Sequence, residues 1–137
     1  MRTFIEAVER HSMVPIVGVV MTHTAYLASQ GGFINDEAPS RICSQALDMG
    51  VKHFVLPGNR PEYLRRYSQE ISSKTSADIS ALMPGIGAQG GQIKLAFEST
   101  NLARCYAIIG SAVYASAEPA KALEEFTNQI LDYERDN

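Results

Sequence analysis

Two glycine-bearing segments supply the groups in this sequence that are best suited to bind an anion. Residues 84–91 read Pro-Gly-Ile-Gly-Ala-Gln-Gly-Gly, with four glycines in the last seven positions. Glycine lacks a Cβ, so its backbone N–H groups can approach a phosphate closely, and Gln89 adds an amide donor. A tight turn between a strand and a helix accounts for the same composition. Gly110 and Ser111, after the next predicted strand, favour the phosphate site.

The other polar candidates favour structural roles. His23 follows a predicted strand, but no Ser–Asp pair that could make it a catalytic base lies near it, so we expect a hydrogen-bonded structural histidine. Arg60 precedes a helix-starting proline, a position typical of packing or subunit contacts. Cys43 and Cys105 stand 62 positions apart without the spacing of a zinc site, so we predict reduced thiols and no zinc site.

Hydrophobic periodicity places these candidates between alternating helices and strands. We predict helices over residues 2–10, 36–49, 61–71, 93–103 and 118–133, and strands over residues 15–21, 51–56, 78–83 and 106–109. Gly50 stands just past the second helix, where a left-handed residue belongs, and Pro61 stands at the first position of the third. The strands recur at spacings of about 27 to 36 residues, as expected of βα units.

Repeated βα units predict an α/β fold with a parallel sheet and right-handed crossovers. Two architectures fit: an open doubly wound sheet, and part of a (β/α)₈ barrel, which usually needs roughly 250 residues. In both, ligands bind beyond the carboxyl ends of the strands. Since no linker interrupts the 137 residues, we predict one domain over residues 1–137.

Charge and hydropathy argue against two classes of partner. With 15 acidic against 12 basic side chains the net charge is −3, so we expect no broad basic surface and no nucleic-acid binding. The longest apolar run, residues 13–21, has nine residues, whereas a membrane-spanning helix needs roughly 20. It also lacks the pattern of a signal peptide, so we expect a cytoplasmic protein without a membrane partner.

Four segments resemble orotidine 5′-phosphate decarboxylases. Residues 84–91 resemble the PG(I/V)GAQGG loop, a motif quite specific to that family, and residues 19–23 (Val-Val-Met-Thr-His) are similar to a strand ending in Met-Ser-His. Residues 59–62 are similar to the (T/S)RPE turn, and residues 107–114 to the IIVGRSIY segment. These motifs cover the C-terminal half of that enzyme. The resemblance therefore implies a parallel (βα)₄ half of a (β/α)₈ barrel, preceded by one helix.

The resemblance assigns substrate-binding roles position by position. Thr22 stands where a family serine hydrogen-bonds the pyrimidine, Gln89 would contact the phosphate, and Gly110 would offer its backbone N–H to the phosphate. The implied substrate-binding residues are Thr22, Pro84, Gly85, Ile86, Gly87, Ala88, Gln89, Gly90, Gly91, Gly110 and Ser111. Ser111 occupies the place of the family's phosphate-binding arginine, and a neutral hydroxyl cannot replace a bidentate guanidinium.

The catalytic array implied by the resemblance is not visible. The family converts orotidine monophosphate to UMP in pyrimidine biosynthesis, without metal or cofactor, through alternating Lys and Asp residues that include a D-x-K-x-x-D motif. The lysines here are Lys52, Lys74, Lys94 and Lys121, and none stands in such a motif. We therefore predict no catalytic residue in this chain, which would hold the substrate-binding half and be inactive alone.

A half-barrel has open sheet edges and so is expected to associate. We expect either a homo-oligomer, such as a homodimer, or a complex with a complementing N-terminal half. The alternative function is a non-catalytic half-barrel that binds a nucleotide or a phosphate. A related sugar-phosphate barrel such as hexulose-phosphate synthase shares the pattern of the last strand but not the GAQGG loop.

Overall fold

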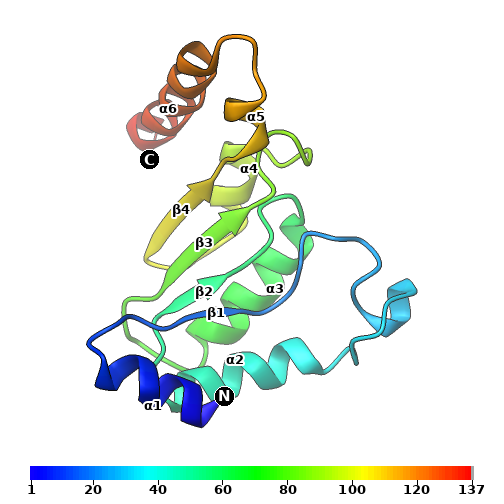
Figure 1. Cartoon of the computed structure of the whole chain (residues 1–137), viewed down its shortest axis with the longest axis vertical. Helices are drawn as coiled ribbons and strands as arrows, with labels where there is room; N and C mark the ends of the chain where they lie inside the picture. The colour runs from blue at the N-terminus through cyan, green and yellow to red at the C-terminus, as the bar shows by residue number, and fades with distance from the viewer. Residues whose placement is uncertain (137) are drawn as a thin grey trace.

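Helices and strands alternate along the whole computed structural model, which describes residues 1–136, and side chains through residue 135 (Figure 1). The strands are β1 (Ile16–Gly18), β2 (His53–Val55), β3 (Ser80–Pro84) and β4 (Arg104–Ile108). The helices are α1 (Arg2–Arg10), η1 (Ala28–Gln30), α2 (Ala38–Asp48), α3 (Pro61–Ser72), α4 (Ile93–Glu98), α5 (Ser111–Tyr114) and α6 (Pro119–Asp136). The predicted succession of a helix followed by four strand–helix units is confirmed.

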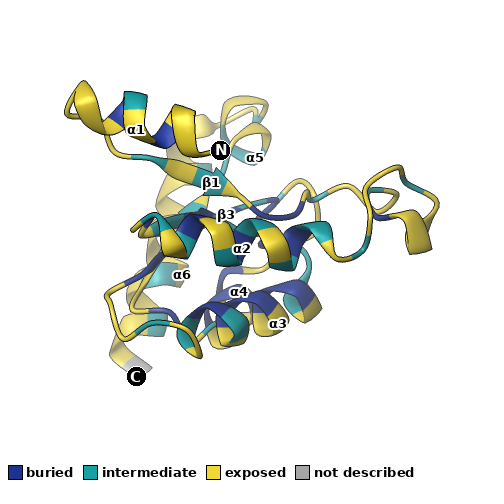
Figure 2. Ribbon diagram, turned by 90° about the horizontal axis from the view of Figure 1, so that it is seen from below, coloured by how far each residue is buried: buried dark blue, intermediate teal, exposed yellow. Residues whose placement is uncertain are grey.

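The four strands form one parallel sheet in the order β1-β2-β3-β4, which is also their order in the chain. One face carries Phe54 and Ala81, which are fully buried and share a core with side chains of α1, α2, α3 and α4. Figure 2 shows the buried residues on α2 and α3. The opposite face is open, since Ile16 of β1 is 50% exposed and Tyr106 of β4 is 51% exposed. The predicted α/β fold with four parallel βα units is confirmed, and its open face is consistent with half of a barrel.

Helix boundaries agree with the sequence where local chemistry sets them. α1 covers the predicted residues, and α3 begins at Pro61, whose ring presets the helical backbone and whose missing N–H costs no bond there. Gly50 follows α2 with φ = 76°, the left-handed conformation expected of a residue beyond a helix end.

Several elements are shorter than predicted, above all β1, β2 and α4; β2 spans His53–Val55 rather than residues 51–56. β1 ends at Gly18 although the apolar run continues to Met21, and the buried Val19 and Val20 extend the core beyond the strand. α4 ends at Glu98 rather than at residue 103. There the side chain of Thr100 accepts a hydrogen bond from the backbone N–H of Leu102 at 3.3 Å, which competes with helical bonding.

Two short elements were not predicted. η1 lies within residues 21–37, a segment that projects away from the sheet (Figure 1, light blue) and includes the fully exposed Phe33. α5 forms a single turn directly after β4, where Val113 and Tyr114 both donate backbone hydrogen bonds to the carbonyl oxygen of Gly110. Both elements are too short to show helical periodicity in the sequence.

Candidate functional site

The predicted binding residues lie at the carboxyl ends of three of the four strands, β1, β3 and β4. Thr22 lies in the segment after β1, residues 84–91 begin at the last residue of β3, and Gly110 and Ser111 follow β4. Parallel strands end at a common edge of the sheet, so these segments meet there. Thr22 is half-buried, whereas Ala88, Gln89, Gly90, Gly110 and Ser111 are exposed. The carboxyl end of the sheet therefore has a half-buried part around Thr22, which we call the floor, and an exposed part formed by the loops after β3 and β4.

The floor forms at Gly85, where the segments after β1, β2 and β3 meet. Its φ is 93°, a conformation that residues with a side chain rarely adopt. A Cβ at this position would lie 2.9 Å from Oδ1 of Asn59 and 3.0 Å from Cγ2 of Thr22. Only glycine lets the segments after β1, β2 and β3 approach so closely.

Asn59 holds the same three segments together through its side chain. Its Nδ2 donates to the backbone oxygen of Thr22 at 3.4 Å and to that of Gln89 at 3.5 Å, while its Oδ1 is shielded from solvent. Among the described side chains, this Oδ1 has no hydrogen-bond partner. No sequence pattern assigns Asn59 a role in the site, although it lies in the turn after a predicted strand, the same position that singles out the other loops.

The glycine-rich segment forms a self-bonded loop with a free tip. The backbone N–H groups of Gly87, Gly90 and Gly91 donate to carbonyl oxygens within the same loop, at 2.9, 2.8 and 3.0 Å. The amides of Ala88 and Gln89 donate to no acceptor within residues 1–136. If the loop binds an anion without rearranging, these two exposed tip amides are free to act as backbone donors.

The loop after β4 lies against the glycine-rich loop. A Cβ on Gly87, whose φ is 80°, would come within 2.7 Å of Cβ of Ala112 and 3.0 Å of Cζ of Phe126. Gly110 and Ser111 are thereby held next to the loop of residues 84–91. The segments after the last two strands are neighbours, the arrangement from which phosphate sites of (β/α)₈ barrels are built.

The close approach at Gly85 makes a testable prediction with a matched control. Gly85→Ala and Gly90→Ala both place a side chain on a left-handed residue, but the added methyl group meets nothing within 4 Å at Gly90. We expect both variants to lose about 1 kcal/mol of unfolding free energy from backbone strain, and Gly85→Ala to lose about 1–3 kcal/mol more from overpacking. Urea unfolding measures both changes, and equal losses would contradict the three-segment contact.

The basic residue nearest in sequence to this floor is engaged elsewhere. Nε of Arg60 lies 2.6 Å from Oε1 of Glu62, and its guanidinium stacks 4.7 Å from the ring centre of Tyr63. Burial tends to raise the pKa of the Glu62 carboxyl, but the hydrogen bond and the charge of Arg60 outweigh it and hold the pKa below its usual value. The structure thus agrees with the packing role predicted for Arg60.

The other singled-out side chains lack the features of reactive groups. His23 is exposed, and its Nδ1 accepts a hydrogen bond from the backbone N–H of Ala25 at 3.2 Å, as a structural histidine would. Burial raises the pKa of the Cys43 thiol to about 12 and also raises that of Cys105. Because thiolate is the nucleophilic form, neither cysteine is an activated nucleophile.

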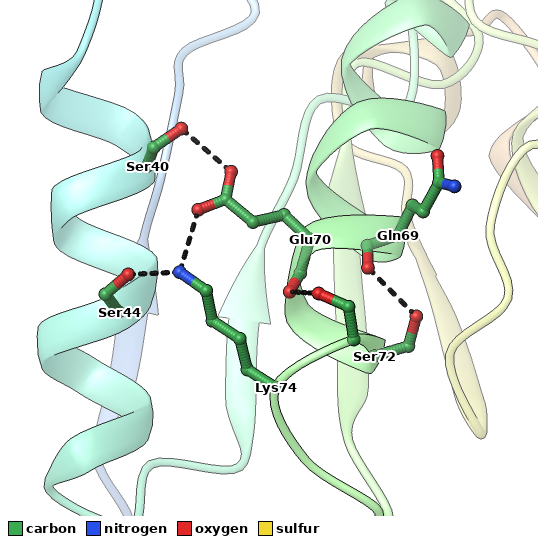
Figure 3. A network of polar contacts seen from close by, with 7 residues as sticks. Ser40, Ser44, Gln69, Glu70, Ser72 and Lys74 are labelled. Atoms are coloured by element: carbon green, nitrogen blue, oxygen red, sulfur yellow. Dashed lines mark hydrogen bonds and ion pairs between the residues drawn. The ribbon is translucent and has the colours of Figure 1, made fainter.

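A groove of about 420 Å³ lies elsewhere, between α2 and α3. Figure 3 shows its polar network: the hydroxyl of Ser40 donates to Glu70 at 2.8 Å, and Nζ of Lys74 bonds both Glu70, at 3.2 Å, and Ser44. These bonds join the two helices side by side. The groove is therefore explained by helix packing, and it is separate from the carboxyl edge of the sheet.

The described residues show neither a metal-binding cluster nor a membrane-spanning helix. Within residues 1–136, no cluster of three or more His, Cys, Asp or Glu side chains is placed to hold a metal ion. No helix in the same range combines the length and the apolar character that crossing a membrane requires.

No family model matches the chain, but characterised relatives do. The orotidine 5′-phosphate decarboxylase of Pyrococcus furiosus is 33% identical over 122 residues, which span 86% of this chain and 50% of that enzyme. The enzyme of Pyrococcus abyssi is 31% identical over 129 residues, which span 94% of this chain and 56% of that enzyme. The chain thus spans about half the length of the relatives it matches.

Solved structures show the same fold. The orotidine 5′-monophosphate decarboxylase of Sulfolobus solfataricus matches 96% of this chain and 55% of its own, with a TM-score of 0.75 and 20% identity. That of Methanocaldococcus jannaschii, complexed with the inhibitor BMP, matches 90% of this chain and 52% of its own, with a TM-score of 0.71 and 22% identity. In sequence and in fold, the chain is therefore similar to about half of the barrel of orotidine 5′-phosphate decarboxylases.

Proposed function

We propose that this chain forms the nucleotide-binding half of an orotidine 5′-phosphate decarboxylase site, in the route to UMP. The observation that carries the proposal is the meeting of Thr22, Asn59 and Gly85 beside the loop of residues 84–91. The Thr22 hydroxyl, which would bind the pyrimidine, thus lies next to a loop whose free backbone amides would bind the phosphate. The BMP complex of the Methanocaldococcus jannaschii relative supports a ligand of this kind.

The proposed contacts follow the geometry of the edge. Thr22, on the floor, would hydrogen-bond the pyrimidine, and the tip amides of Ala88 and Gln89 would reach the phosphate from one side. Gly110 would donate its backbone N–H from the other side, because α5 lies against the glycine-rich loop. A nucleotide would then lie across the carboxyl edge from β1 to β4, with its phosphate at β4.

The decarboxylation step itself would need residues from outside residues 1–137. Lys74, Lys94 and Lys121 form ion pairs with glutamates on their own helices or next to them, and no lysine pairs with an aspartate among the described side chains. An alternating Lys–Asp array that could protonate carbon as carbon dioxide leaves is thus not assembled here. We propose that the other half of the barrel supplies it and that this chain alone is inactive.

A non-catalytic nucleotide- or phosphate-binding protein is the second candidate. Ser111 favours it, because this exposed residue stands where the family has an arginine and brings no positive charge to the phosphate. Both candidates predict nucleotide binding. They differ in whether decarboxylation appears when the other half of the barrel is supplied.

Calorimetric titration with UMP and with uridine tests the shared binding claim. We expect weak binding of UMP, weaker binding of uridine because the tip amides then have no phosphate to bind, and no decarboxylation of orotidine monophosphate by the chain alone. The absence of heat at millimolar UMP would remove both candidate functions. Decarboxylation by the isolated chain, followed by the loss of substrate absorbance, would show that it carries catalytic residues of its own.

We also propose that the chain is cytoplasmic. Support comes from its two cysteines, which are both unpaired thiols. Reduced thiols are the usual state in that compartment.

A further inference from the structure

The groove between α2 and α3 is lined by eight side chains, all of them polar or charged. Three are the cations Arg41, Arg66 and Lys74, and two are the carboxylates Glu37 and Glu70. The lining therefore carries one surplus positive charge in a chain whose net charge is −3. A groove of this composition favours a polar, negatively charged ligand over an apolar one.

The network that joins the two helices engages the acceptors of the groove and leaves donors free. Both carboxylate oxygens of Glu70 accept hydrogen bonds, one from Ser40 at 2.8 Å and one from Nζ of Lys74 at 3.2 Å (Figure 3). Nζ of Lys74 also donates to Oγ of Ser44, so this hydroxyl acts as an acceptor and keeps its own proton. An ammonium group has three N–H donors, and two bonds leave the third available. The free groups therefore call for a ligand rich in acceptor oxygens.

Helix packing does not account for the two arginines of the groove. Arg41 belongs to α2 and Arg66 to α3, so each wall contributes one guanidinium. Both side chains are exposed, and neither pairs with a carboxylate among the described residues. The guanidinium of Arg66 lies 5.3 Å from the ring centre of Tyr67, which restricts its position at the wall.

We propose that the groove between α2 and α3 binds the phosphoryl groups of a small polyphosphate, held between Arg41 and Arg66. The planar fork of a guanidinium matches the oxygens of a phosphoryl group and binds them through two parallel hydrogen bonds. The volume of about 420 Å³ has room for more than one such group. A ligand with several negative charges also outweighs the repulsion of the exposed Glu37. This site lies on the helix layer and is independent of the nucleotide contacts proposed at the carboxyl edge.

Calorimetric titration of the full chain with inorganic pyrophosphate and with inorganic phosphate tests the site at one low ionic strength. We expect pyrophosphate to bind more tightly than phosphate, because it offers a phosphoryl group to each arginine. Arg41→Gln and Arg66→Gln should each weaken pyrophosphate binding by about tenfold, since each removes one charge-assisted contact. Arg10→Gln is the matched control, because Arg10 is an equally exposed arginine that lies on α1.

Removing the opposing carboxylate should have the reverse effect. Glu37→Gln keeps the length of the side chain and deletes its negative charge, so we expect pyrophosphate to bind several-fold more tightly. Glu6→Gln deletes the same charge from an exposed position on α1 and should change little. Circular dichroism should show the same helix content for all the variants.

The position of the bound pyrophosphate separates this site from the glycine-rich loop. Amide NMR spectra should show shifts in residues 38–48 and 61–74, and UMP should bind Arg41→Gln and the original chain equally. No heat at millimolar pyrophosphate would overturn the proposal. So would equal weakening by Arg10→Gln and Arg66→Gln, or amide shifts confined to residues 84–91. Loss of UMP binding alone would instead count against the nucleotide site, so the two failures are distinguishable.

Discussion

Replacing Ser111 by arginine is expected to tighten UMP binding by about 30-fold, or about 2 kcal/mol. Ser111 is exposed at the start of α5, next to the glycine-rich loop, so a guanidinium there can reach the proposed phosphate position without displacing a buried group. Arginine binds phosphate through two parallel hydrogen bonds, whereas the serine hydroxyl offers one neutral donor. Calorimetry on the two proteins at one ionic strength measures the change.

Two controls tie this gain to the phosphate. Ser111→Lys adds the same charge without the planar fork and should recover only part of the affinity. Uridine, which lacks the phosphate, should bind the original chain and the Ser111→Arg variant equally. An equal gain for uridine, or no gain for UMP, would show that position 111 does not face the phosphate.

Phe54→Ala is expected to lower the free energy of unfolding by about 3–5 kcal/mol. Phe54 is fully buried on the helix side of the central strand β2, where its ring fills the core shared by the sheet and the helices. Domains of this size are usually stable by only about 5–15 kcal/mol, so the loss is a large part of the total. Urea unfolding followed by circular dichroism measures it.

Tyr106→Ala is the matched test on the other side of the sheet. Tyr106 is 51% exposed on the side of the sheet away from the helices, so its truncation should cost under about 1 kcal/mol in the isolated chain. Comparable losses for Tyr106→Ala and Phe54→Ala in the isolated chain would show that both sides of the sheet are already packed.

The sequence predicts the succession of elements because local chemistry specifies it. Pro61 and Gly50 set helix ends through their own backbone preferences, and the burial of Phe54 and Ala81 follows from an apolar run covered by helices. The end of α4 escaped prediction because the side chain of Thr100 competes with helical hydrogen bonds. The bounds of β1 follow from its register with β2, which periodicity does not report.

The residues of the candidate site are also only partly predictable from the sequence. Composition and resemblance single out residues 84–91 from the sequence, because glycines with positive φ are needed where segments meet closely. Asn59 was missed because its role comes from bonds to Thr22 and Gln89, which lie 37 and 30 positions away. Bonds within the loop, such as that from Gly87 to Gly91, likewise decide which amides remain free, and no sequence pattern reports them.

The agreement between strand order and chain order has a consequence for how this chain folds. The strands that pair are close in sequence: Val17 pairs with Phe54 after 37 positions, Phe54 with Ala81 after 27, and Ala81 with Cys105 after 24. Each closure is entropically inexpensive compared with joining the first strand of a full barrel to its last. The sheet can therefore grow by one unit at a time as the polypeptide leaves the ribosome, each new strand docking on the one made before it.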